Sequence, residues 1–294
     1  MRKSFLSYIL LLLPLSILTL LGACNNVTPD TSKRSISVTI LPQQYLAEQI
    51  AGERFHINCV VPANNNPEAY DPTPAQLIAI DNSEAYLRVG MLGFEMAWID
   101  RISKNSPHLQ FYDTSQGIDM IVAPHTHHAH DGHTHIVDPH IWCSPRNARI
   151  MAHNIYNVLC SLDTAGTAYY SNRYTTLIQR IDSVESVVSQ LLTPIKGKAF
   201  AIYHPSLSYM ARDYGLQQIA IENAGKESSV HSMKNVIDEA REAGVEVVFV
   251  QREFNSQQVE SFANELDCKI VTINPLNYDW AQEMIDIAYA LAQQ

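Results

Sequence analysis

Histidine is concentrated in one short part of this chain. Six of the twelve histidines fall within residues 125–135, where no strand or helix pattern is present. The six are His125, His127, His128, His130, His133 and His135. Imidazole is a good ligand for Zn²⁺, Ni²⁺ and Cu²⁺, and a histidine-rich tract predicts an exposed metal-binding loop. Because such a loop is too mobile for one well-defined site, we expect it to collect ions or to sense the metal supply.

Two further histidines stand beside prolines. His140 lies in Asp138–Trp142, and His204 lies in Tyr203–Ser206. Proline fixes one backbone dihedral angle and so restricts the position of a neighbouring side chain. His204 also ends a predicted strand, and open α/β sheets bind ligands beyond the carboxyl ends of their strands. We therefore predict that these two imidazoles, which come from different halves of the chain, meet at one metal site.

The segments that must position these histidines alternate between strand and helix patterns. The predicted strands are 36–40, 57–61, 85–89, 199–203, 218–221, 245–250 and 269–273. The predicted helices are 43–51, 74–82, 94–104, 145–162, 206–214, 232–243, 256–266 and 280–292. This alternation predicts an α/β fold with two lobes, residues 35–164 and 195–294, each a mostly parallel sheet flanked by helices.

A long helical segment separates the two lobes at residues 165–194. Its apolar residues recur at alternating steps of four and three, which places them on one helical face. They are Tyr170, Tyr174, Leu177, Ile181, Val184, Val188 and Leu191. A helix of about 25 residues is roughly 38 Å long, the height of a small domain. We expect a rigid spine that joins the lobes.

The beginning of the chain predicts export. A charged start is followed by a short apolar run and then by small residues, which describes a secretory signal peptide over residues 1–23. The sequence Leu-Gly-Ala before Cys24 resembles a bacterial lipobox, in which this cysteine is lipidated. The polar residues 24–34 then form a flexible tether. We expect a membrane-anchored lipoprotein on the periplasmic or extracellular side.

Charge and cysteine content exclude some classes of protein. The net charge of −10 disfavours nucleic acid as a partner, because phosphates require a basic face. No CxxC motif is present, which argues against a zinc finger built from thiolates. The remaining cysteines could form up to two disulfides, and no spacing identifies a pair. They are Cys59, Cys143, Cys160 and Cys268.

Several motifs together resemble one family, the zinc- and manganese-binding lipoproteins of ABC importers, or periplasmic zinc-uptake proteins. The resemblance covers nearly the whole chain. It rests on the lipobox, Pro67–Pro74, the histidine-rich loop, Asp138–Trp142, the spine, Tyr203–Pro205, Glu253-Phe254 and Asn274–Leu276. It implies two lobes joined by one long helix, a metal ion in the cleft between them, and a membrane permease as partner.

The resemblance also implies a ligand set, with two departures from the family pattern. His140 and His204 stand at ligand positions, whereas Glu68 replaces the usual first histidine. Asn274 replaces a frequent aspartate, and the nearest carboxylate is Asp279. We therefore expect Glu68, His140, His204 and a fourth oxygen ligand, from Asp279 or else from water. Glu68 could instead be a solvated residue, and Asp279 could be a helix N-cap.

The expected cargo is Zn²⁺, and the Glu68 carboxylate makes Mn²⁺ or Fe²⁺ the alternative. We expect a monomer that is not an enzyme. A metallohydrolase is disfavoured because the acid in His128–His133 stands one position too early for an HxHxDH motif, and HExxH is absent. A metal-storage or adhesin lipoprotein without a transporter is the rival binding function.

Overall fold

The computed structural model describes residues 34–122, 137–222, 229–254 and 257–293. Within it, residues from Arg34 onward form one compact unit that contains two four-stranded sheets. Every pair of named strands in these sheets is parallel. The predicted α/β fold with two parallel-sheet lobes is therefore confirmed. The signal peptide, Cys24 and the histidine-rich loop 125–135 lie outside the described residues.

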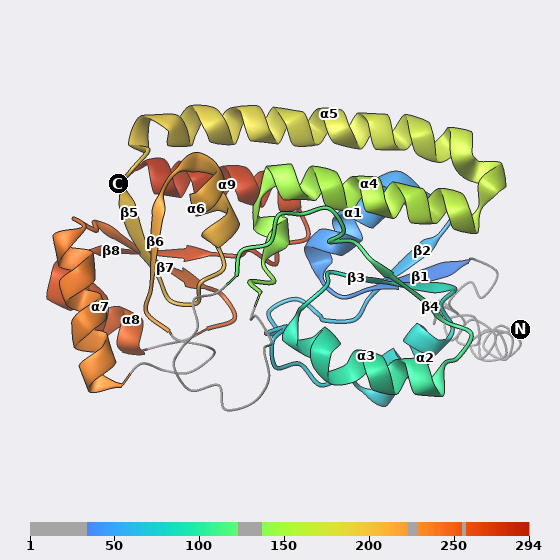
Figure 1. Cartoon of the computed structure of the whole chain (residues 1–294), viewed down its shortest axis with the longest axis horizontal. Helices are drawn as coiled ribbons and strands as arrows, with labels where there is room; N and C mark the ends of the chain where they lie inside the picture. Colours follow the sequence, from blue (N-terminus) through green and yellow to red (C-terminus); the bar gives the residue numbers. More distant parts are fainter. Residues whose placement is uncertain (1–33, 123–136, 223–228, 255–256, 294) are drawn as a thin grey trace, which may run out of the picture. The chain divides into compact units, whose positions relative to one another are not determined.

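The first lobe has the strand order β2-β1-β3-β4. Its strands are β1 (Ser35–Val38), β2 (His56–Cys59), β3 (Ala85–Arg88) and β4 (Gln110–Asp113). Its helices are α1 (Leu41–Ala51), α2 (Pro74–Asp81), α3 (Gly93–Asn105) and α4 (Pro145–Leu162). In Figure 1, α1 and α4 lie on one face of the sheet, and α2 and α3 lie on the other.

Local sequence signals explain where these helices begin. Thr73 and Gln76 form a reciprocal capping box at the start of α2, and a proline follows at the first helical position. Ser144 accepts a hydrogen bond from the Asn147 backbone N–H at the start of α4, again with a proline next in sequence. The start of α4 fixes the chain just after His140.

The second lobe repeats this arrangement with the strand order β6-β5-β7-β8. Its strands are β5 (Ala199–Ile202), β6 (Gln217–Ala220), β7 (Val247–Gln251) and β8 (Lys269–Ile273). Its helices are α6 (Ser208–Tyr214), α7 (Val230–Glu242), α8 (Gln257–Leu266) and α9 (Trp280–Ala292). In both lobes the second strand pairs on one side of the first strand, and the third strand pairs on its other side. This creates a topological switch point, β1/β3 in one sheet and β5/β7 in the other.

The spine is α5 (Thr167–Leu192), whose 26 residues span about 39 Å. It lies over α4 of the first lobe and α9 of the second (Figure 1). Most residues on its predicted apolar face are buried, and Tyr174 and Leu191 pack against the core while partly exposed. The main hydrophobic core runs through α5 into both lobes. The lobes therefore share one core, which restricts how far they can separate.

Two tryptophans fasten the lobes to each other beneath the loop that carries His140. Trp142 Nε1 donates to the Pro275 carbonyl at 2.9 Å, and Trp280 Nε1 donates to the Trp142 carbonyl at 2.7 Å. Both tryptophans are 1% exposed. A buried indole N–H without a partner would cost about 1–3 kcal/mol, so these two bonds favour the closed arrangement of the lobes.

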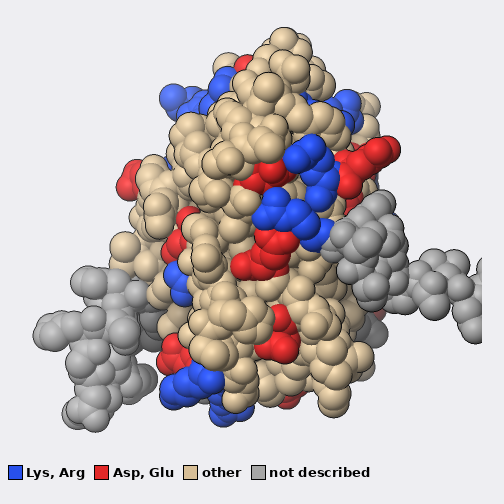
Figure 2. Space-filling model, turned by 90° about the vertical axis from the view of Figure 1, so that its right-hand side faces the viewer, with Lys and Arg blue, Asp and Glu red and all other residues tan. Residues whose placement is uncertain are grey.

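Some expectations differ from the structure. Strand β4 has no counterpart among the predicted strands, because it is short, begins and ends with polar residues and is only partly buried. The four cysteines named above are all free thiols, so none of them pairs with another. Within the described ranges, no helix is long and apolar enough to span a bilayer. On the face shown in Figure 2, basic and acidic side chains lie beside each other. Neither sign of charge forms a broad patch there.

Candidate metal centre

His140 is held by the acid two residues before it. Asp138 Oδ1 accepts hydrogen bonds from the His140 backbone N–H at 2.9 Å and from the ring Nδ1 at 2.8 Å. The Asp138 carbonyl accepts a further bond, at 2.7 Å, from Tyr209 of the second lobe. The His140 side chain is 7% exposed. One carboxylate thus fixes both the backbone and the ring, and the other ring nitrogen, Nε2, points away from it.

His204 follows β5 at the carboxyl end of the strand, as predicted. Its Nδ1 lies 3.1 Å from Glu222 Oε1, just beyond β6. Gln251, the buried last residue of β7, donates from Nε2 to the His204 carbonyl at 2.5 Å and to Ser206 Oγ at 2.8 Å. The loop that carries His204 is therefore held from two neighbouring strands.

The two imidazoles face each other. The Nε2 atoms of His140 and His204 are 3.1 Å apart, and the ring planes are inclined by 76°. Each Nδ1 lies beside a carboxylate, so each neutral ring carries its proton on Nδ1 and a lone pair on Nε2. Two lone pairs at this distance repel each other unless a cation or a proton lies between them. In a tetrahedral zinc site with Zn–N bonds of about 2.05 Å, two ligand nitrogens stand roughly 3.3 Å apart.

Glu68 reaches the same place from the loop after β2. Its Oε2 accepts from the Gly93 backbone N–H at 2.9 Å, at the positive end of α3. Gly93 permits this close approach, because a Cβ there would lie 2.2 Å from the Glu68 carbonyl oxygen. Glu68 Oε1 is buried and has no hydrogen-bond partner. One carboxylate oxygen is thus anchored, and the other is available to a ligand.

Glu68, His140 and His204 line one cavity of about 10 Å³, which suits a single water or ion. Glu253, just beyond β7, lines the same cavity, and its Oε2 is also buried without a hydrogen-bond partner. No three His, Cys, Asp or Glu side chains in the described segments already surround a common point. The two imidazoles therefore face each other without a third such side chain grouped around them, and an ion bound there would need the carboxylates to turn toward it.

Acidic neighbours change the proton affinity of His140. Burial lowers the pKa of His140, but the hydrogen bond and charge of Asp138, together with the charges of Glu68 and Glu253, outweigh burial and raise it. Burial opposes ionisation of Asp138, yet its bonds to His140 bring the pKa of the carboxyl below its ordinary value. A surplus of negative charge therefore surrounds the imidazole pair and favours a bound cation.

The structure does not bring Asp279 into this group. It is exposed and accepts from the Gln282 backbone N–H at 3.2 Å, as the N-cap of α9. Asn274 does not line the cavity either, although Pro275 and Leu276 do. Val122 and Val137, the described residues on either side of the histidine-rich segment, pair with each other. Val137 lies next to Asp138 in the sequence.

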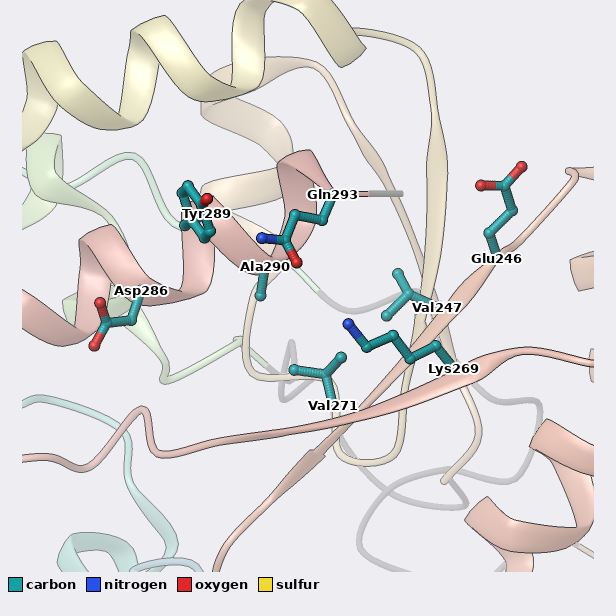
Figure 3. A pocket seen from close by; sticks show the side chains of 8 residues that line it. All are labelled: Glu246, Val247, Lys269, Val271, Asp286, Tyr289, Ala290 and Gln293. Atoms are coloured by element: carbon teal, nitrogen blue, oxygen red, sulfur yellow. The ribbon is translucent and has the colours of Figure 1, made fainter.

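A larger cavity lies elsewhere, with a volume of about 370 Å³ (Figure 3). It is lined by residues of β7, β8 and α9 and by the residue that precedes β7. They are Glu246, Val247, Lys269, Val271, Asp286, Tyr289, Ala290 and Gln293. Its lining contains neither histidine nor cysteine, and its charged groups are of both signs. This cavity has no donor set for a transition metal.

Sequence reasoning missed the roles of four residues at the site. They are Asp138, Glu222, Gln251 and Glu253. Asp138 and Glu253 belong to quoted motifs, but nothing in a motif distinguishes an outer partner from a ligand. Glu222, Gln251 and Glu253 share a position at the carboxyl ends of β6 and β7. That position is the signal that could have found them.

Known proteins are similar to most of this chain. A family model for the zinc-uptake complex component A, periplasmic (ZnuA), matches residues 36–292. The high-affinity zinc uptake system protein ZnuA of Bacillus subtilis is 24% identical over 272 residues, which cover 87% of this chain and 85% of that protein. The zinc-binding lipoprotein AdcA of Streptococcus pneumoniae is 22% identical over 265 residues, which cover 87% and 52%.

Solved structures give the same result. A crystal structure of ZnuA matches with a TM-score of 0.81 at 32% identity, and the match covers 89% of this chain and 98% of that one. FpvC from Pseudomonas aeruginosa, in complex with Mn²⁺, matches with a TM-score of 0.76 at 22% identity, over 89% and 97%. The second likeness concerns the fold alone.

Proposed function

This chain belongs to the family of the zinc-uptake complex component A, periplasmic, and we propose that it captures Zn²⁺ between its lobes for delivery to a membrane permease. The observation that carries this proposal is the facing pair of imidazoles, with Nε2 atoms 3.1 Å apart and each Nδ1 beside a carboxylate. Such a pair is arranged to bind a cation, and we propose that the chain binds and carries the ion without catalysing a reaction.

We take Glu68, His140 and His204 as ligands. Glu68 and His140 come from the first lobe and His204 from the second, so the ion is held only while the lobes are together. The shared core and the tryptophan bonds favour this closed arrangement. Release therefore requires a small local separation at the cleft, which withdraws His204 from the other two ligands. A permease that binds both lobes can drive that step.

Zn²⁺ fits this donor set best. Two imidazoles favour zinc over the harder cations, and a carboxylate is an ordinary zinc ligand at about 2.0–2.2 Å. The Glu68 oxygen weakens that preference relative to an all-histidine site, so Mn²⁺ and Fe²⁺ are expected to bind less tightly than Zn²⁺. We further propose that the protein is a monomer, exported and tethered to the membrane through Cys24.

Calorimetry with Zn²⁺ tests the binding step. The six histidines of residues 125–135 are first replaced by asparagine in the full chain, so that the heat reports on the cleft alone. We expect one ion per chain, with binding lost in His140→Ala and in His204→Ala and retained in His56→Ala, which removes an exposed histidine. Equal affinity in all four proteins would refute the site.

Delivery requires a separate experiment. The Zn²⁺-loaded chain is added to liposomes that hold the permease and ATPase of a zinc ABC importer from the same organism. We expect ATP-dependent uptake of zinc with the parent chain and none with His204→Ala. Uptake at the same rate without the chain would show that it does not deliver the ion, and the storage or adhesin function would then gain support.

A further inference from the structure

Glu253 is an acid at the cleft that the ligand set above does not use. It stands two residues beyond β7, and its side chain lines the same small cavity as Glu68, His140 and His204. Its Oε2 is buried and has no hydrogen-bond partner among the described residues. A buried carboxylate oxygen without a partner is costly, so its presence at this position requires a physical reason.

The other buried polar atoms without hydrogen-bond partners indicate what this reason is. Five buried side-chain polar atoms in the described part of the chain have no hydrogen-bond partner, and the only acceptors among them are Glu68 Oε1 and Glu253 Oε2. Both belong to residues that line this cavity. The two residues whose carboxylate oxygens lack a donor or a cation therefore line the same cavity as the two imidazoles.

The topology of the second lobe places Glu253 for this role. His204 follows β5 and Glu253 follows β7, so they flank the β5/β7 switch point at the carboxyl edge of the sheet. Gln251 connects the two strand ends through its bonds to the loop of His204. Each lobe then presents one imidazole and one carboxylate to the cavity: His140 with Glu68, and His204 with Glu253.

We propose that Glu253 is the fourth ligand of the cleft cation, in the place that Asp279 was expected to take. This inference rests on the proposed metal-binding function. Two carboxylates and two neutral imidazoles carry two negative charges, so a divalent cation makes the buried site electrically neutral. Neutrality lowers the cost of burying the ion and its ligands together. Asp279, by contrast, is exposed and already bonded to the start of α9.

The proposal has a consequence for metal preference. Oxygen donors suit harder cations such as Mn²⁺, whereas imidazole suits Zn²⁺. A site with two histidines and two carboxylates should therefore bind Mn²⁺ measurably, and loss of one carboxylate should weaken Mn²⁺ more than Zn²⁺. The charge of Glu253 already acts on one of the two imidazoles, since it contributes to raising the pKa of His140.

The test compares Glu253→Gln with Glu260→Gln, an exposed acid on α8, and with Asp279→Asn. All are made in the full chain whose loop histidines are asparagines. We expect Glu253→Gln to weaken Zn²⁺ by more than about tenfold and Mn²⁺ by more than that, and to shift the visible absorption bands of bound Co²⁺. The other two variants should match the parent.

A loss smaller than about tenfold, or unchanged Co²⁺ bands, would overturn the assignment of Glu253. If His204→Ala still abolishes binding in that case, the proposed function stands and only the fourth ligand is wrong. If His204→Ala also binds normally, the proposed function itself fails.

Thermal unfolding without metal distinguishes a folding defect in Glu253→Gln from the loss of a metal ligand. Removing a buried charge that has no partner should leave the melting temperature of Glu253→Gln equal to or above that of the parent. The rise caused by Zn²⁺ should be smaller in the variant. A lower melting temperature without metal, with an unchanged Zn²⁺ effect, would mean that Glu253 is structural.

Discussion

Asp138→Asn should weaken zinc binding without removing any ligand. Asp138 Oδ1 holds the His140 backbone N–H at 2.9 Å and Nδ1 at 2.8 Å, so it fixes the ring and keeps its proton on Nδ1. Asparagine retains one acceptor oxygen but loses the charge. Loss of such an outer partner typically costs about 10–100-fold in metal affinity, or about 1.4–2.7 kcal/mol. We expect a change of this size at pH 8, where protons compete less with the metal for His140 than at lower pH.

The pH dependence gives this prediction a second readout. A proton competes with the metal for His140 Nε2, and Asp138 helps to raise the pKa of His140 in the metal-free protein. The parent therefore loses affinity at a higher pH than the variant when the solution is acidified. The difference in affinity between the two proteins should shrink as the pH falls.

The assay is competition with a fluorescent zinc chelator, at several pH values, in the chain whose loop histidines are asparagines. Asp119→Asn is the matched control, because it removes an exposed aspartate from the same lobe. A loss below about twofold at pH 8 for Asp138→Asn, or the same loss in Asp119→Asn, would refute the reasoning. In that case the contact between Asp138 and His140 would not tune the ligand.

Three further predictions concern stability and reactivity. Hydrogen bonds from Tyr170 and Arg54 hold the pKa of buried Asp163 below its ordinary value, against the effect of burial. The stabilisation from these bonds is therefore present above about pH 3.9 and is lost as the pH falls through the lower pKa of the folded state. In Asp163→Asn the free energy of urea unfolding should depend less steeply on pH in this acid range, and an unchanged slope would contradict the prediction. Trp142→Phe removes a buried donor to a carbonyl of the opposite lobe and should lower the free energy of unfolding by at least about 1–3 kcal/mol, with a value near zero excluding the contact. Burial raises the pKa of the Cys143 thiol, so iodoacetamide should alkylate it only in urea, as mass spectrometry of the peptides can show, and rapid labelling of the native chain would mean that the thiol is not buried.

The fold was predictable because the spacing of apolar residues in the sequence indicates which segments form helices and strands. The bounds 145–162, 269–273 and 280–292 agree with α4, β8 and α9, since capping residues and breakers mark their ends. Strand β4 was missed because its four residues carry no alternating apolar pattern that separates a short edge strand from a loop. Strand pairing and lobe contacts are long-range, so the shared core became visible only in three dimensions.

The site was predictable only where local chemistry marks a residue. His140 and His204 stand beside prolines and at an element boundary, and the structure places their Nε2 atoms 3.1 Å apart. Glu68 follows from the family pattern, and its role as a ligand stays a prediction. An aspartate before a helix can be either a cap or a ligand, so the sequence could not decide the role of Asp279. Glu253 reaches the cavity only through the arrangement of β5 and β7.

The most direct test of the shared cation site is a crystal structure of the Zn²⁺-loaded chain, with anomalous scattering measured on both sides of the zinc edge. We expect one strong peak between the two lobes, about 2.0–2.1 Å from Nε2 of both His140 and His204, with a carboxylate oxygen of Glu68 within about 2.2 Å. Zinc bound elsewhere on the two lobes, while the two imidazoles stay in direct contact with no ion between them, would contradict the account.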